Sequence, residues 1–404
     1  MALRAAGHYK AHTLADAGAA PMRVGLSPLP PDVMTNDTDF EIFLATVPGL
    51  EPVLAEEVRL KGFKRPRTVP GGVVTRGGWP EVWRANLWIR GAGSVLARIA
   101  SFRAVHVAQL DTLAHRVPWA DVLRRDVPFR VEASCAGSRL YHSGAVAQRI
   151  ATAIRDTLGA PESPDAPVVV MARVEKDVCT ISLDTSGEPL HKRGYKEAVN
   201  AAPLRETMAA LFLRQCGYDG TEPMVDPMCG SGTFVIEAAE IAARLNPGRA
   251  RAFAFEQLAT FDAEAWGRMR AVSRERATDI RCHGHDRDAG AIAMSQANAE
   301  RAGVADITTF RQGAISDLQP PEGPPGLVIL NPPFGARLGD SGKLAPLYRA
   351  LGQVLATRFA GWRVGLVAQE AKLAHATALP FLTPGPPVPH GGLRVTLFRT
   401  GPLA

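Results

Sequence analysis

The residues with the clearest chemistry are Asn331, Pro332, Pro333 and Phe334, which follow the apolar run Leu327–Leu330. Four aliphatic residues ended by a proline-rich turn are typical of a buried strand, so the tetrapeptide is predicted to lie at a strand's carboxyl end. There, the Asn331 side-chain carbonyl and the Pro332 backbone carbonyl can accept the two hydrogens of an exocyclic amine. Phe334 can stack on a base, and the prolines stiffen the loop. The pattern indicates group transfer to a base nitrogen, with all four residues predicted as catalytic.

A glycine-rich motif upstream, Asp226-Pro227-Met228-Cys229-Gly230-Ser231-Gly232-Thr233, could hold a methyl donor. Its glycines let a ligand approach the backbone, and the free amides of a helix opening at Thr233 favour a carboxylate. NAD-binding and purely structural turns can also be glycine-rich, but this spacing lacks the third glycine of a dinucleotide fingerprint. We expect S-adenosylmethionine to bind at Asp226, Met228, Gly230, Gly232 and Thr233, with Asn331 in contact as well.

The segment His285-Asp286-Arg287-Asp288 follows the next predicted strand, 280–284. Asp286 could accept hydrogen bonds from both ribose hydroxyls of the cofactor. Asp288 is the alternative ligand, or it caps the following helix. No cysteine lies beside Asn331 to act as a nucleophile, and Cys229, within the glycine-rich turn, is expected to pack rather than react.

The second half of the chain, from Pro203, is predicted to be α/β with a mostly parallel sheet covered on both faces. Because ligands of such sheets bind outside the carboxyl ends of the strands, the motifs above fall where a site is expected. The predicted strands are 224–225, 280–284, 307–310, 327–330 and 364–368, the helices are 234–245, 289–302 and 344–359, and an antiparallel strand at 393–398 closes the sheet edge.

The first half is predicted to be α+β. Its expected elements are a strand at 40–47, a helix at 50–60, a strand at 129–132, a helix at 145–158 and a hairpin of 167–174 with 178–183. Between them lies a basic run, which could be a solvated helix end and loop or a phosphate-contact patch. It consists of Lys61, Lys64, Arg65 and Arg67.

Composition narrows the class of protein. The 404 residues carry a net charge of +6 and are 46% hydrophobic, which suits a globular chain and is compatible with an anionic partner without proving one. The five cysteines show no metal-binding or disulfide spacing, which favours a reducing, cytoplasmic location. Residues 1–38 lack the apolar core of a signal peptide, and we expect a disordered leader, a start codon placed too early or, less simply, a transit peptide.

Four segments carry a family resemblance: Leu190–Tyr195, Ala202–Thr207, Asp226–Thr233 and Asn331–Gly339. Together they resemble the THUMP-domain class I RNA guanine-N2 methyltransferases, and within them the N-terminal half of the bacterial 23S rRNA enzymes. The resemblance implies a ferredoxin-like domain at 39–105, a THUMP domain at 106–189 and a Rossmann-like, seven-stranded methyltransferase domain at 190–404. It also implies RNA contacts from the basic run and from Lys192 and Arg193.

One departure from the family pattern concerns the adenine of the cofactor. Gly313-Ala314 stands where the family usually has an aspartate, so Asp317 or a backbone carbonyl is expected to take that role. The chain ends where the two-headed ribosomal enzymes continue into a second methyltransferase domain, so a single activity is expected.

The resemblance implies methylation of a guanosine N2 amine, in 23S rRNA or alternatively in transfer RNA. DNA adenine methyltransferases share the Asn-Pro-Pro-aromatic motif, but the N-terminal α+β region disfavours them. From a different class, a catalytically idle RNA-binding or assembly factor is disfavoured by the intact motifs. We expect a monomer with an RNA partner, no metal and no membrane association.

Overall fold

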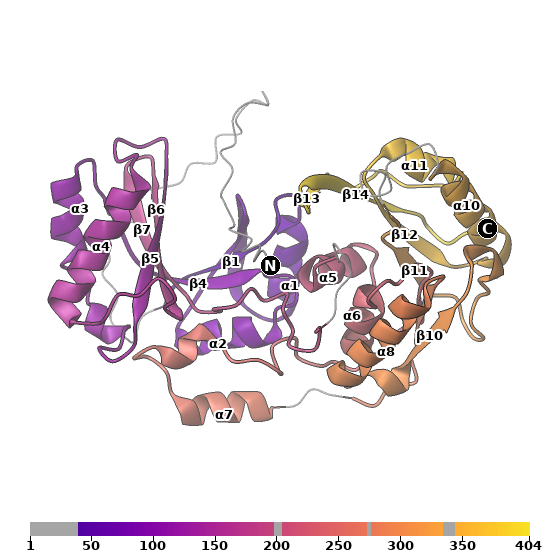
Figure 1. Ribbon diagram of the computed structural model, residues 1–404, viewed down its shortest axis with the longest axis horizontal. Helices are drawn as coiled ribbons and strands as arrows, with labels where there is room; N and C mark the ends of the chain where they lie inside the picture. The colour runs from indigo at the N-terminus through magenta and orange to yellow at the C-terminus, as the bar shows by residue number, and fades with distance from the viewer. Residues whose placement is uncertain (1–38, 198–203, 273–275, 334–343) are drawn as a thin grey trace, which may run out of the picture. The chain divides into compact units, whose positions relative to one another are not determined.

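The computed structural model describes residues 39–197, 204–272, 276–333 and 344–404. Two seven-stranded sheets organise this part of the chain (Figure 1). The first sheet has the order β2-β3-β1-β4-β7-β6-β5. Its strands are β1 (Phe40–Ala45), β2 (Lys64–Val69), β3 (Gly72–Gly77), β4 (Ser94–Arg103), β5 (Phe129–Ala136), β6 (Val168–Glu175) and β7 (Val178–Asp184).

Strand β4 joins the two N-terminal regions into this one sheet. It pairs antiparallel with β1, where Ala45 lies opposite Ser94, and with β7, where Arg103 lies opposite Val178. The β4–β7 pairing has a register shift between Arg98 and Ala100. The regions predicted as ferredoxin-like and THUMP domains are therefore continuous through backbone hydrogen bonds.

Helices accompany this sheet in both regions. In the first they are α1 (Glu51–Leu60) and α2 (Trp79–Trp88), and in the second they are α3 (Val107–Ala114) and α4 (Ser143–Leu158), which pack against each other. The predicted hairpin is confirmed, because β6 and β7 pair antiparallel across Lys176-Asp177. The basic run could be a solvated helix end and loop or a phosphate-contact patch. Lys61 is the C-cap residue of α1, whereas residues 64–67 form part of β2, which pairs with β3 only among the described strands.

The second sheet has the order β10-β9-β8-β11-β12-β14-β13, parallel from β10 to β12 and antiparallel at β14 and β13. This confirms the predicted mostly parallel α/β fold with an antiparallel final strand. Its strands are β8 (Met224–Asp226), β9 (Cys282–Asp286), β10 (Thr308–Gln312), β11 (Leu327–Leu330), β12 (Arg363–Ala368), β13 (Val388–His390) and β14 (Leu393–Arg399). Its helices are α5 (Glu206–Gln215), α6 (Thr233–Ala242), α8 (Ala289–Ala302), α10 (Ala345–Arg358) and α11 (Ala371–Ala376). Helix α7 (Ala263–Ala271) packs against α2 of the first region instead.

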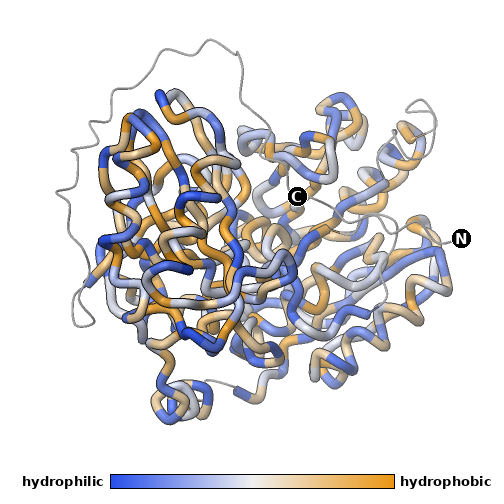
Figure 2. The backbone as a smooth tube through the Cα atoms, turned by 60° about the vertical axis from the view of Figure 1, so that its left-hand side comes forward, coloured by the Kyte–Doolittle hydropathy of each residue, from blue (hydrophilic) through white to orange (hydrophobic). Residues whose placement is uncertain are grey.

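Strand β11 shows why its sequence is uniformly apolar. Leu327 and Ile329 belong to one hydrophobic core, whereas Val328 and Leu330 belong to a second. Successive side chains of a strand point to opposite faces, so a sheet covered on both faces requires apolar residues at every position. Figure 2 shows such hydrophobic segments running through the interior. Among the described residues, no helix combines the length and the apolarity that crossing a bilayer requires.

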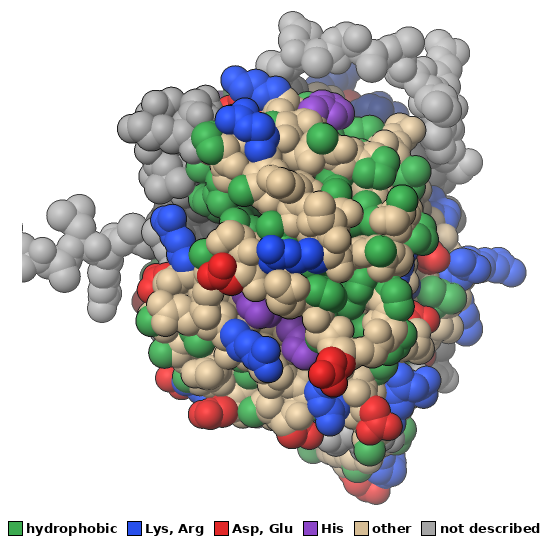
Figure 3. All heavy atoms as spheres, turned by 90° about the vertical axis from the view of Figure 1, so that its right-hand side faces the viewer, with side chains coloured by type: hydrophobic (Ala, Val, Ile, Leu, Met, Phe, Trp, Pro, Cys, Tyr) green, Lys and Arg blue, Asp and Glu red, His purple; other side chains and the backbone are tan. Residues whose placement is uncertain are grey.

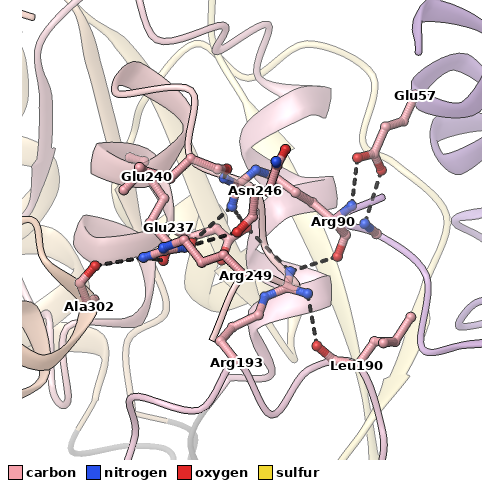
Figure 4. A network of polar contacts seen from close by, with 12 residues as sticks. Glu57, Arg90, Leu190, Arg193, Glu237, Glu240, Asn246, Arg249 and Ala302 are labelled. Atoms are coloured by element: carbon pink, nitrogen blue, oxygen red, sulfur yellow. Dashed lines mark hydrogen bonds and ion pairs between the residues drawn. The ribbon is translucent and has the colours of Figure 1, made fainter. Parts of the chain in front are cut away.

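A buried ion network connects α6 to the segment that follows α2 (Figure 4). Glu237 and Glu240 of α6 have fully buried side chains, and the Arg90 guanidinium lies 2.7 Å from Glu237 Oε1 and 3.0 Å from Glu240 Oε2. Arg193 reaches the same Glu237 oxygen at 3.3 Å and donates to the Arg90 carbonyl at 2.8 Å. Glu57 of α1 accepts the backbone N–H of Arg90 at 2.7 Å.

The charges of this network depend on one another. Burial opposes the Arg90 charge, but Glu237 and Glu240 outweigh it and raise the pKa of the guanidinium. Burial alone would raise the pKa of Glu237, yet Arg193 and Arg90 lower it below its ordinary value. The ionised forms of Arg90 and Glu237 are therefore favoured by the charges packed against them.

We predict that Arg90→Ala destabilises the protein by about 3 to 5 kcal/mol, because it leaves Glu237 and Glu240 as incompletely paired buried charges. The matched control is Arg268→Ala, whose exposed pair with Glu264 should be worth less than about 1 kcal/mol. Urea unfolding of the two variants measures the difference. Equal losses of stability would contradict the assigned role of the network.

Candidate functional site

The strand order reverses at β8, and the predicted site residues lie at that point. From β8 the chain proceeds to β9 and β10 on one side and returns to β11 on the other. The carboxyl ends of these parallel strands carry Asp226, Asp286 and Asn331. In open α/β sheets, ligands bind outside the strand ends where the order reverses. The structure thus brings both sequence motifs to one place.

The loop between β8 and α6 has the backbone that a ligand cradle requires. Gly230 and Gly232 have φ of +55° and +82°, a region that favours glycine. A Cβ on Gly232 would lie 3.2 Å from the Ser295 Cβ, so this position is also tightly packed. Helix α6 begins at Thr233, directly after the loop.

Two side chains of α8 that sequence reasoning missed hold this loop. The Ser295 hydroxyl donates to the Gly230 carbonyl at 2.8 Å, and the Asn298 amide donates to the Ser231 carbonyl at 3.1 Å. Both side chains are buried. Because they satisfy loop carbonyls that would otherwise lack partners, they fix the backbone shape of the cradle.

Asp286 lies against the cradle, and Asp288 does not take part in it. Asp286 Oδ2 accepts the Gly230 N–H at 3.0 Å, and its Oδ1 accepts the Asp288 N–H at 3.0 Å. Each carboxylate oxygen can accept further hydrogen bonds, so the group can still receive hydroxyls. The Asp288 side chain accepts the Gly290 N–H at 2.8 Å as the N-cap of α8, which is the second of its two predicted roles.

Asp226 is an acid in an environment that opposes its charge. Its side chain is buried and accepts the Met228 N–H at 3.0 Å. Burial raises the pKa of Asp226 to about 8, and repulsion from Asp286 adds to the effect. A positively charged ligand group beside it would favour the ionised form again.

Lys196, which precedes α5 in the sequence, lies in space beside the start of α6. Its ammonium donates to Thr233 Oγ1 at 2.7 Å and lies 3.0 Å from Glu206 Oε1, with both charged side chains nearly buried. The sequence motifs did not identify Lys196 as a site residue. Its place beside Thr233 adds a cation where the carboxylate end of the cofactor is predicted.

Asn331 follows β11 and carries an acceptor without a partner. Its Oδ1 is buried and accepts no hydrogen bond from any residue that the structure describes. Leaving a buried carbonyl unpaired costs about 1 to 3 kcal/mol, so such an atom marks a place where a donor from outside the chain fits. Pro332 is buried and Pro333 is exposed, whereas Phe334 lies outside the described residues.

The fold and this geometry agree with known families. Residues 41–96 match an RlmL ferredoxin-like domain, residues 105–184 match a THUMP domain, and residues 193–380 match a methyltransferase domain described as RMKL-like. A solved structure from Listeria monocytogenes, a predicted N6-adenine-specific DNA methylase, is 30% identical with a TM-score of 0.81. It covers 90% of this chain and 97% of its own. The chain belongs to the methyltransferases that carry a ferredoxin-like and a THUMP domain ahead of an RMKL-like methyltransferase domain.

Two further relatives are a ribosomal RNA methyltransferase and a methyltransferase structure with bound SAH. Ribosomal RNA large subunit methyltransferase K/L of Psychromonas ingrahamii is 34% identical over 346 residues, or 82% of this chain and 46% of that protein. The chain spans about half the length of the curated relatives it matches. SMU.472, a putative methyltransferase solved in complex with SAH, is 26% identical with a TM-score of 0.81, and the match covers 92% of this chain and all of that one.

The structure also places Cys229 and the predicted adenine contact. Cys229 is buried, its Sγ lies 3.8 Å from Ser295 Oγ, and burial raises its pKa, so it packs as expected. Near the predicted adenine position, the Gly313 N–H donates to the Asp286 carbonyl at 3.0 Å, while Asp317 is exposed. The adenine contact from Asp317 or a backbone carbonyl stays a prediction.

The predicted RNA contacts need one correction. Arg193 is only 3% exposed and pairs with Glu237, so in this structure it is not available to a phosphate. Lys64 and Arg67 lie at the surface in ion pairs with Asp39 and Glu41, and Lys192 pairs with Glu188. Such exposed pairs are weak, and phosphate could replace the acid. Arg65 is exposed, and Lys61 is half-buried.

One face of the methyltransferase region mixes charged and apolar side chains. Figure 3 views the molecule from the right-hand side of Figure 1, where the strands and helices of the second sheet lie. Among the described side chains visible there, lysines and arginines are separated by apolar and acidic ones.

Within the described residues, no group of three or more histidine, cysteine or acidic side chains could hold a metal.

We predict that Asp286→Ala weakens S-adenosylmethionine binding roughly tenfold or more, because the carboxylate that is predicted to accept the two ribose hydroxyls is lost. Asp288→Ala is the matched control, since it removes a helix cap worth about 1 kcal/mol of stability while leaving the cofactor site intact. Calorimetric titration measures affinity, and thermal unfolding measures stability. The reverse order of affinities would transfer the ribose role to Asp288.

Proposed function

We propose that this chain transfers a methyl group from S-adenosylmethionine to the N2 amine of a guanosine in a structured RNA. The RNA we propose is 23S ribosomal RNA. The observation that carries the proposal is the buried Oδ1 of Asn331 at the strand-order switch, which has no hydrogen-bond partner among the described residues, together with the glycine cradle after the neighbouring strand β8. An acceptor in this position suits an amine that enters with two hydrogens to donate.

The residues around the cradle fit S-adenosylmethionine. Asp286 would accept the ribose hydroxyls, and the start of α6 with Lys196 would receive the carboxylate. Asp226, whose charge is disfavoured by burial, would gain from a nearby cationic group of the ligand. When bound, the cofactor supplies an electrophilic methyl group on a positively charged sulfur.

The chain's own contribution is to orient the amine and to exclude water. Asn331 Oδ1 would accept one amine hydrogen and the Pro332 carbonyl the other, which holds the nitrogen with its lone pair directed out of the base plane. The buried Pro332 ring and the apolar end of β11 keep solvent away, which strengthens these hydrogen bonds. No residue of the chain needs to form a covalent bond to the base.

The choice of RNA rests on the N-terminal half. The pair of acceptors formed by Asn331 Oδ1 and the Pro332 carbonyl, here called the amine clamp, would also suit an adenine in DNA. The Listeria relative is named as a DNA methylase of this kind. The THUMP match and the large-subunit name of the Psychromonas relative favour ribosomal RNA, with transfer RNA as the alternative. The five free cysteines fit a reducing compartment such as the cytoplasm.

We predict that Asn331→Ala lowers the turnover rate by two to three orders of magnitude, about 2.7 to 4 kcal/mol, the scale for one preorganised polar contact in a transition state. Its affinity for S-adenosylmethionine should stay close to wild type, because Asn331 acts on the amine. Gln353→Ala on the exposed side of α10 is the control and should keep full turnover. Wild-type turnover in Asn331→Ala would remove the basis of the amine clamp.

A further inference from the structure

The THUMP region presents an aromatic side chain to solvent. Tyr141 lies between β5 and α4 and is 71% exposed, more than the other exposed large hydrophobic residues that the structure describes. The His142 ring lies beside it, with ring centroids 4.1 Å apart and planes 43° from each other. An exposed aromatic pair gains nothing from the protein core, which makes it a candidate contact for a partner.

The segment that leads to Tyr141 is held in place. Leu140 is buried in the hydrophobic core, so the preceding residue anchors the ring's backbone. The Arg139 N–H donates to Asp177 Oδ1 at 2.8 Å, and the Asp177 N–H donates to Ser138 Oγ at 3.0 Å. These bonds tie the loop to the β6–β7 turn, so little ordering is required when a partner binds.

Two exposed cations lie in the loop before the ring and in the β6–β7 turn that is tied to it. Arg139 and Lys176 are exposed, and no acidic side chain among the described residues forms an ion pair with either. Asp177, the acid in this turn, is mostly buried, accepts the Arg139 backbone N–H and lies 3.9 Å from Arg103. His142 is the N-cap residue of α4 but makes no side-chain hydrogen bond to its first turn.

We propose that the Tyr141 and His142 rings stack on an unpaired base of the RNA, with Arg139 and Lys176 contacting the phosphates next to it. Aromatic rings recognise bases that are free of a duplex, and cations beside them follow the backbone. A protein partner would not need these cations, so the charge favours a nucleic acid. The inference rests on the proposed function only for the identity of that nucleic acid as RNA.

The test is fluorescence anisotropy of the full chain with a labelled single-stranded RNA oligonucleotide and with the same sequence as a duplex. Tyr141→Ala should weaken single-strand binding on the order of tenfold, and Tyr141→Phe should bind like wild type because stacking needs only the ring. Tyr141→Leu should bind as weakly as Tyr141→Ala. The matched control is Leu382→Ala, at a position that is 55% exposed outside the THUMP region.

The cations supply an independent readout. Arg139→Ala and Lys176→Ala should each lower the slope of log affinity against log salt by about 1, whereas Tyr141→Ala should leave that slope unchanged. Wild-type single-strand affinity in Tyr141→Ala, or full affinity in Tyr141→Leu, would overturn the stacking assignment. An equal loss for single strand and duplex would overturn it as well.

Failure of this inference and failure of the proposed function give different results. Binding is measured without a methyl donor, so an enzyme that methylated no RNA could still show the Tyr141 effect. Conversely, methylation of RNA by Tyr141→Ala at the wild-type KM would overturn the stacking role and leave the methyltransferase proposal intact.

Discussion

Two glutamates buried in one helix constrain how the rest of the chain is built. Glu237 and Glu240 are inaccessible to solvent in α6, and the cost of burying such charges is several kcal/mol for each ion unless partners compensate it. Arg90 follows α2 in the first region, and Arg193 lies in the segment between β7 and α5. Pairing the glutamates therefore requires three segments that are distant in sequence to meet. Apolar residues could fill the same space, but they would not impose this particular meeting.

The position of these charges matters because α6 begins at the cofactor loop. The same helix that pairs with Arg90 starts at Thr233, beside Gly232 and Lys196. The first region is in turn continuous with the THUMP region through β4. Backbone hydrogen bonds and buried ion pairs thus link the THUMP region to the helix that begins at the cofactor loop.

The sequence predicted the parts of the fold that have strong local patterns. The apolar run 327–330, the helices at 145–158, 289–302 and 344–359 and the hairpin of 167–174 with 178–183 lie within a few residues of the observed elements. Asp226 and Asn331 were recognised because turn residues follow short apolar strands. The predicted helix cap at Asp288 also depends only on neighbouring residues.

Other features depended on contacts that are distant in sequence. Strand β2 has the composition Lys-Arg-Pro-Arg-Thr-Val, and pairing with β3 rather than local propensity makes it a strand. Ser295 and Asn298 are ordinary polar residues of a helix until the loop at 230–231 packs on them. Arg193 looked like a surface cation because its partner Glu237 lies in an unrelated motif.

The most direct test of the central claim is nucleoside mass spectrometry after incubation of the purified chain with methyl-labelled S-adenosylmethionine and unmodified nucleic acids. Ribosomal RNA of the large subunit, transfer RNA and DNA should be offered separately. The account predicts that the label appears as N2-methylguanosine in large-subunit ribosomal RNA. Label in N6-methyladenosine of DNA, or on a ring carbon of any base, would contradict it.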